Sequence, residues 1–84
     1  MKEVYFTKHS IESMRKRGVS EDEVKTAISN AQWQTSKWEK LECNFEFEYN
    51  KKWNAKHYNK KQVVPIFVEE EEKIVIITVY AFYF

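Results

Sequence analysis

The feature that most constrains the fold is the last run of the chain, Ile74 to Phe84, in which every residue except Thr78 is apolar or aromatic. Most of these side chains are β-branched or aromatic and none is charged, which is typical of a strand with cover on both faces. Such a strand also needs hydrogen-bonded neighbours along both edges, because an unpaired apolar edge promotes aggregation. We therefore predict a central strand here, with helices or a second sheet packed against its faces.

The length and composition of the chain limit the remaining possibilities. The sequence is long enough for one folded domain, residues 1–84, and too short for a second core. An aromatic content of 17%, with one Gly and one Pro, argues against disorder. The formal net charge is only +1, so any contact with nucleic acid depends on local segregation of charge. Residues 8–17 and 51–61 are basic, and residues 69–72 are acidic.

The single cysteine, Cys43, excludes an intramolecular disulfide and a site built from several thiolates. No signal-peptide pattern opens the chain, and the longest apolar run is too short for a helical membrane span. We expect a cytoplasmic protein that does not interact with a membrane and uses no metal or cofactor.

Two helices are predicted in the first third of the chain. Thr7 can cap a helix that runs to about residue 17, where Gly18 provides a left-handed terminator. Ser20 and Glu23 have the spacing of a capping box, which starts a second helix that ends near residues 30–32. Both helices are expected to cover one face of a sheet.

The second half of the chain is predicted to contain four antiparallel strands. Residues 41–49 alternate apolar side chains with an acidic outer face, a polar strand follows at about residues 53–58, and turns are expected at residues 50–52 and 59–61. Residues 62–69 form the third strand, where Pro65 indicates a bulge or an edge-facing position. The polar connection at residues 32–40 gives no clear backbone signal. The prediction is an α+β fold with two N-terminal helices packed on a four-stranded antiparallel sheet.

The chain contains no glycine-rich phosphate loop, nucleophile elbow or metal-ligand pair at helical spacing. The remaining candidate is His9, near a helix start that also carries Arg17 and the expected RNA-binding residues Lys8, Arg15 and Lys16. A neutral imidazole can take the proton of a ribose 2′-hydroxyl, and an arginine can stabilise the phosphate as charge develops, without a metal ion. With His9, Ser13 and Arg17 at i, i+4 and i+8, we predict one polar ridge pointing away from the core. The alternative is that His9 is an ordinary exposed residue and the basic cluster a solvated face.

A second basic candidate is the hairpin at residues 51–61. Its lysines could follow phosphates while Trp53 and Tyr58 stack on bases, and the RNA-binding residues expected here are Lys52, Lys56, His57 and Tyr58. The alternative is a pair of solvated turns whose lysines protect strand edges. We expect the glutamates at 42, 46 and 48 to pair with these lysines across strands. Thr78 and Tyr80 share one face of the last strand, either in the core or lining a cleft.

Three blocks of the sequence resemble a known family: Phe6 to Ile11, Met14 to Ser20 and Ile77 to Tyr80. Over nearly the whole chain they resemble the small bacterial proteins catalogued as domain-of-unknown-function 4258, although Ser10 stands where that family usually has Ala. That family is similar in outline to the ribonuclease toxins of the barnase, EndoU, colicin and RelE type, in which helices precede a curved antiparallel sheet, and to the BrnT toxins.

This resemblance implies a function and a set of site residues. It implies His9, Arg17, Thr78 and Tyr80 as catalytic positions of a metal-independent endoribonuclease, with RNA as substrate and an antitoxin protein as partner. A second class of function stays open, in which the same basic face belongs to a non-catalytic module that binds RNA or a protein.

Overall fold

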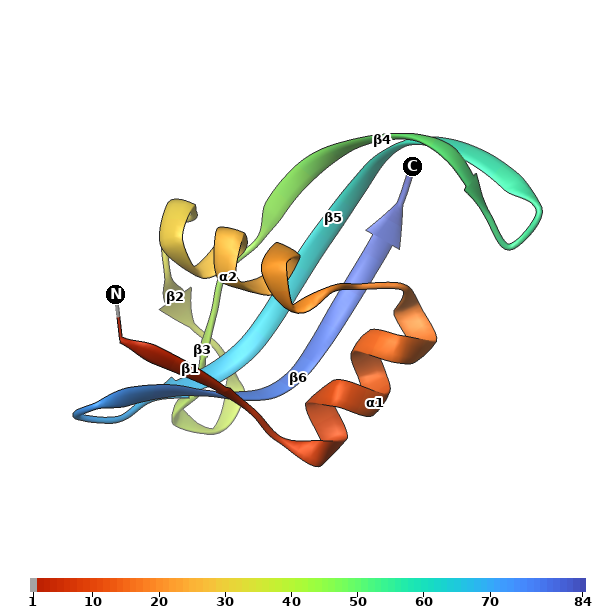
Figure 1. Cartoon of the computed structure of the whole chain (residues 1–84). Helices are drawn as coiled ribbons and strands as arrows, with labels where there is room; N and C mark the ends of the chain where they lie inside the picture. The colour runs from red at the N-terminus through yellow and green to blue at the C-terminus, as the bar shows by residue number, and fades with distance from the viewer. Residues whose placement is uncertain (1) are drawn as a thin grey trace.

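The computed structural model describes residues 2–84 as two helices and six strands in one sheet (Figure 1). The first half of the chain contains β1 (Glu3–Phe6), α1 (Lys8–Arg17) and α2 (Glu21–Asn30). A short connection follows with β2 (Gln34–Thr35), the 3-10 helix η1 (Lys37–Glu39) and β3 (Leu41–Glu42). The long strands come last: β4 (Phe45–Trp53), β5 (Lys56–Glu69) and β6 (Lys73–Tyr83).

The sheet is mostly antiparallel and open, in the order β1-β6-β5-β3-β2, with β4 also paired to β5. The prediction of an α+β fold with two helices is confirmed, and β6 lies between β1 and β5 as a central strand. The predicted count of four strands is wrong. The strand β1 has only four residues, and it pairs in parallel with β6, seventy positions away at Glu3↔Lys73. A strand this short leaves too little alternation for the sequence to indicate it.

The turns predicted at residues 50–52 and 59–61 are also wrong. The chain reverses at Asn54 and Ala55, both with positive φ, and β5 then runs unbroken through the lysines to Glu69. Asn50 instead lies at a register shift in β4 between Glu48 and Lys51. Polar residues do not break a strand whose backbone is paired on both sides, and β5 is paired with β4 and β6 along this segment.

The predicted strand at residues 41–49 is interrupted, and the interruption lies opposite Pro65. The strand β3 ends at Glu42, which pairs with Ile66, and β4 begins at Phe45, which pairs with Val63. Proline has no N–H to donate to a neighbouring strand. Because the neighbouring strand is interrupted opposite Pro65, no carbonyl of that strand lacks a hydrogen-bond donor there. The predicted irregularity near Pro65 is therefore confirmed.

A bulge in β6 changes which of its side chains face the core. Between β5 and β6 the register moves from Ile66↔Thr78 to Phe67↔Ile76, so Ile77 is an extra residue. The bulge places both Ile76 and Val79 on the buried side, although they are three residues apart. It also leaves Ile77 and Thr78 together on the opposite side.

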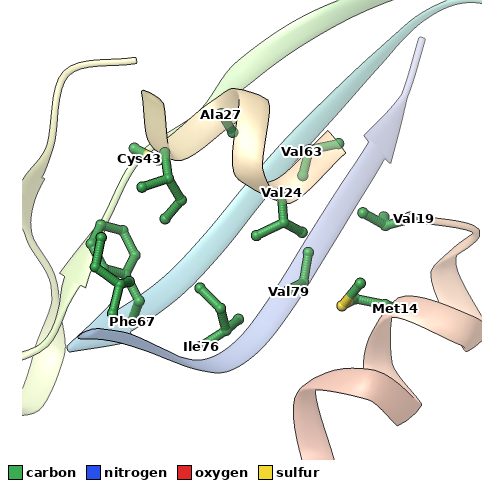
Figure 2. Close-up of a cluster of buried hydrophobic side chains, with 11 residues drawn as sticks. Met14, Val19, Val24, Ala27, Cys43, Val63, Phe67, Ile76 and Val79 are labelled. Atoms are coloured by element: carbon green, nitrogen blue, oxygen red, sulfur yellow. The ribbon is translucent and has the colours of Figure 1, made fainter. Parts of the chain in front are cut away.

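The hydrophobic core lies between the sheet and the two helices (Figure 2). Figure 1 shows α2 crossing over β5, and α1 lying beside β6. The fully buried members of the core come from both layers: Val24, Ala27, Cys43, Val63, Phe67, Ile76 and Val79. Neither helix combines the length and the apolar character that crossing a membrane requires.

The opposite face of β6 has little cover, which corrects the prediction of a strand buried on both faces. On that face Tyr80, Phe82 and Phe84 are 42%, 53% and 55% exposed. Neither helix covers this face, so the apolar character of β6 serves two purposes. One half of its side chains forms the core, and the other half forms a surface.

Helix α1 satisfies the backbone of β6 where β1 ends. The last β1 residue, Phe6, pairs with Ile76, and the N-cap Thr7 then donates to the Ile76 carbonyl from its amide (3.3 Å) and its hydroxyl (2.8 Å). Two residues beyond the bulge, the amide of Val79 donates to Ser13 Oγ at 3.1 Å. Ser13 is buried, so the predicted polar ridge is wrong at this position. Its hydroxyl faces the strand because it completes the hydrogen bonding of the strand edge.

We predict that Ser13→Ala lowers the free energy of unfolding by about 1–3 kcal/mol, because the buried Val79 amide loses its acceptor. Chemical denaturation followed by circular dichroism measures this change. Ser10→Ala is the matched control, since Ser10 is equally buried but only donates to the Thr7 carbonyl, which also accepts from the Ile11 amide. An equal loss in both variants would contradict the role given to Ser13.

We predict that Ala55→Gly raises the free energy of unfolding by about 0.5–1 kcal/mol. Ala55 has φ 68 in the two-residue turn between Trp53 and Lys56, a conformation in which its Cβ approaches the following carbonyl. Asn54→Gly should change stability less, because Asn tolerates this conformation. Thermal melting of the two variants beside the parent tests the order.

Candidate functional site

The open face of the sheet carries a groove of about 850 Å³. Its floor is formed by side chains from the two central strands, Gln62, Val64 and Ile66 of β5 and Ile77, Thr78, Tyr80 and Phe82 of β6. One wall comes from the connection around η1, with Lys37, Trp38 and Lys40. The groove therefore combines an apolar and aromatic floor with cationic side chains on a wall, which suits a ligand with flat rings and negative charge.

Arg17 stands at the edge of this groove, above Tyr80. Its Cζ lies 5.2 Å from the centre of the Tyr80 ring, within the range of a cation–π contact. None of the ion pairs among residues 2–84 involves Arg17, so its guanidinium N–H groups are available to an anion. The backbone here is fixed, because the Arg17 carbonyl accepts from Tyr83 Oη at 2.5 Å and Gly18 ends α1 at φ 71.

The structure brings three of the four predicted catalytic residues together. Thr78 and Tyr80 both line the groove, where Tyr80 contacts Arg17. His9 is exposed and lies eight residues before Arg17, about 12 Å along the axis of α1. At about 100° per residue, His9 and Lys16 project from the side of the helix that carries Ser13 and Arg17. They therefore lie along the same rim of the open face, without direct contact between His9 and Arg17.

The other predicted RNA-binding residues lie in two separate places. Lys8 and Arg15 are exposed on the side of α1 turned away from β6. The rest occupy the end of the β4–β5 hairpin, where Lys52 pairs with His57 and Lys56 with Trp53. Tyr58 is half-buried there, 5.7 Å from the Tyr83 ring. This hairpin end contributes nothing to the groove lining.

Lys61 does not belong to a phosphate-binding patch, although the sequence placed it among the hairpin lysines. It is only 4% exposed, and its ammonium donates to the Gly18 carbonyl at 2.5 Å and to Glu23 Oε1 at 2.8 Å. Its position in β5 is opposite Phe47 and Tyr83, on the face that the helices cover. Glu23 also accepts from the Ser20 amide at 2.9 Å, so one carboxylate serves both the capping box and the buried lysine.

Trp53 is part of the same cluster and is no free stacking surface. Its ring stacks on Tyr83 with 5.0 Å between centres and 14° between planes. It also covers Gly18, where an added Cβ would lie 2.5 Å from Trp53 Cζ3. Tyr83 therefore occupies one face of the ring that was expected to stack on a base.

Trp38 is a candidate that the sequence did not indicate. It has φ 61 and ψ 40, a region that costs a bulky residue about 1–2 kcal/mol, and its side chain is 85% exposed on the groove wall. An exposed aromatic ring held in such a backbone conformation is a feature of ligand sites. The only sequence signal was a tryptophan within a polar connection.

Of the acidic side chains on β3 and β4, Glu42 lines the groove. Glu48 pairs with Lys60 at 2.5 Å, so the predicted pairing across strands is confirmed for Glu48. The hydrogen bond with Lys60 holds the pKa of the Glu48 carboxyl below its ordinary value. Within residues 2–84, no group of three or more His, Cys, Asp or Glu side chains is arranged to hold a metal ion. Burial raises the pKa of the Cys43 thiol to about 11, which makes it a poor nucleophile.

We predict that Tyr83 makes the protein lose stability as the pH rises from about 10 to 12. Burial, with Tyr49 and Glu23 nearby, raises the pKa of Tyr83 to about 12, above the value of about 10 expected in the unfolded chain. Between these values the unfolded chain releases the proton more readily than the folded one, so stability is complete below pH 10 and falls above it. Denaturant unfolding at pH 8 and pH 11.5 should show a smaller fall in Tyr83→Phe than in the parent, and equal falls would contradict this assignment.

Comparison with known proteins gives one match. A family model described as "Domain of unknown function (DUF4258)" matches residues 6–81, which includes α1, most of the groove floor and most of β6. No curated protein matches the chain. No solved structure matches it either.

Proposed function

The chain belongs to the DUF4258 family, and we propose that it is a toxin-type endoribonuclease that binds RNA on the open face of its sheet and cleaves it without a metal ion. The observation that carries the proposal is the position of Arg17. Its guanidinium has no carboxylate partner in the described chain, lies over the Tyr80 ring and borders a groove with an aromatic floor. A planar guanidinium of this kind binds two oxygens of a phosphate, while the adjoining rings offer stacking surfaces for bases.

The proposed reaction uses residues along one rim of the groove. A phosphodiester over the Ser13 turn of α1 would lie between His9 and Arg17. His9 would take the proton of the 2′-hydroxyl, and the resulting oxygen would attack the adjacent phosphorus. The 5′-oxygen of the next nucleotide would leave and take a proton from water. Arg17 would stabilise the charge that develops on the phosphate, with hydroxyl donors from Thr78 and Tyr80 nearby. The products would carry a 2′,3′-cyclic phosphate and a 5′-hydroxyl.

A second candidate is a non-catalytic module that binds RNA or a protein through the same face. The observation that favours it is the surroundings of His9. Within residues 2–84 no hydrogen bond or ion pair orients the imidazole, whereas the histidine of an acid–base pair is usually held by a further group. An antitoxin that covers the exposed aromatic rings fits either candidate.

We predict that the purified protein cleaves single-stranded RNA in the presence of EDTA and leaves 2′,3′-cyclic phosphate ends. His9→Ala should lower the rate by about 100-fold or more, the usual contribution of one acid–base group. Arg17→Ala should cause a similar loss, and Arg17→Lys a smaller one, because lysine keeps the charge without the planar fork. Gel analysis of a labelled RNA and mass spectrometry of its ends provide the measurements.

Arg15→Ala is the matched control, since Arg15 lies on the same helix and projects away from the groove. It should cleave at close to the parental rate. If cleavage depends on a divalent metal, or if folded His9→Ala and Arg17→Ala proteins keep the parental rate, the catalytic assignment is wrong. RNA binding without cleavage in the parent would favour the non-catalytic candidate.

A further inference from the structure

Three aromatic rings form a row along β6 on the open face of the sheet. Tyr80, Phe82 and Phe84 occupy alternate positions, and each is between 42% and 55% exposed. We call this row the aromatic ladder. Arg17 lies at its first ring, and no helix covers it. A ladder of this kind on a paired strand is rigid, because the backbone of β6 is fixed by β5 along Tyr80, Phe82 and Tyr83.

The distance between neighbouring rings of the ladder favours a single-stranded nucleic acid over a duplex. Alternate residues of a strand are about 6.6 Å apart, roughly twice the 3.4 Å between stacked nucleotides of one duplex strand. Consecutive bases can therefore lie on consecutive rings only when the strand is extended and its own bases are unstacked. A duplex cannot satisfy this spacing, because its bases are stacked on one another and paired.

The charges around the ladder fit a polyanion that runs along β6. Arg17 and Lys16 lie near the Tyr80 end. At the other end, Phe84 exchanges backbone hydrogen bonds with Lys60, and β5 continues from there into the basic hairpin end. The carboxylates of Glu46 and Glu48 lie beyond β5, on β4. Phosphates are therefore favoured on the α1 side of the ladder, and base edges on the β5 side.

The middle ring has two polar neighbours in a line across the sheet. Phe82 is directly opposite Gln62 on β5, and Gln62 is directly opposite Glu46 on β4. Side chains at directly opposite positions share a face and have Cβ atoms about 4.5–5.5 Å apart. The Watson–Crick edge of a base stacked on Phe82 would thus face the amide of Gln62 and, beyond it, the carboxylate of Glu46.

Guanine is the base whose edge best fits that pair. Its N1–H and N2–H groups are adjacent donors for the two oxygens of a carboxylate, and its O6 accepts from an amide N–H. Uracil has a single N–H flanked by two carbonyl oxygens, which repel the Glu46 carboxylate. No ion pair among residues 2–84 involves Glu46.

We propose that the aromatic ladder binds three consecutive unpaired nucleotides of an RNA strand, with their bases on Tyr80, Phe82 and Phe84 and a guanine preferred at the middle position. This inference rests on the proposed binding of RNA to the open face and adds its substrate class. It does not depend on catalysis.

The test uses short fluorescein-labelled 2′-O-methyl oligonucleotides, which lack the free 2′-hydroxyl needed for cleavage. Fluorescence anisotropy compares an oligoadenylate containing one central guanine, the same strand with uracil in its place, and the guanine strand annealed to its complement. The single strand should bind at least about 10-fold more tightly than the duplex, because each stacked base contributes roughly 5- to 150-fold. The guanine probe should bind at least about 5-fold more tightly than the uracil probe.

Three variants and one matched control identify the ladder as the source of these differences. Phe82→Ala should weaken binding of the single strand by about 5-fold or more, and Phe82→Trp should retain it. Glu46→Leu should remove the preference for guanine, because the carboxylate both accepts from the guanine N–H groups and repels the uracil carbonyl oxygens. The control is Tyr5→Ala: Tyr5 on β1 is 53% exposed, as Phe82 is, and lies outside the groove, so its loss should leave binding unchanged.

The outcomes separate this inference from the proposed function. If no probe binds and unmodified RNA is neither bound nor cut, the proposed function itself fails. If RNA binds but duplex and single strand bind equally, or if folded Phe82→Ala binds like Tyr5→Ala, the ladder is not the RNA site. In that case the exposed rings are better explained as a surface that binds a protein partner. Equal affinity for the guanine and uracil probes would overturn the base preference.

Discussion

The hydrogen bonds between α1 and the edge of β6 are the constraint on which the rest of the structure depends. The strand β1 covers this edge only as far as Ile76, and Thr7 and Ser13 then supply partners for the strand on either side of its bulge. Because the helix replaces a strand here, its axis lies at the level of the sheet. Met14 can thus enter the core on one face while Arg17 reaches Tyr80 on the other. One helix position therefore determines both the packing and the groove.

The parts of the fold that the sequence predicted are those specified by neighbouring residues. The caps at Thr7 and Ser20 and the terminator Gly18 each depend on a few adjacent positions, and all three are present. The strand β1, by contrast, exists because β6 needs a partner, and nothing within four residues signals it. The prediction that β6 is buried on both faces was wrong because its exposed face is also aromatic, with Tyr80, Phe82 and Phe84. The bulge at Ile77, which moves the core-facing positions from 74 and 76 to 79, was not predicted either.

The sequence predicted several residues of the candidate site, but it did not predict how all of them are arranged. Arg17, Thr78 and Tyr80 were expected as site residues, and the structure places them around one groove. Ser13 and Lys61 were expected at the surface, but the side chain of each is buried and forms a hydrogen bond with a backbone group from a distant part of the chain. Polar side chains are usually solvated, and the exceptions are set by tertiary contacts that a local pattern does not contain. Trp38 was missed for the same reason, because its exposure follows from how the connection folds over the sheet.

Gly18 illustrates how two distant parts of the chain are tied to one another. The residue ends α1 in a left-handed conformation, and the ring of Trp53 fills the space where a side chain would begin. A helix terminator alone tolerates asparagine in place of glycine, but the ring forbids even a methyl group. Among relatives, positions 18 and 53 should therefore vary together. Sequences with a small residue at 53 should be those in which position 18 is released from glycine, so that changes in the hairpin and in the helix are coupled.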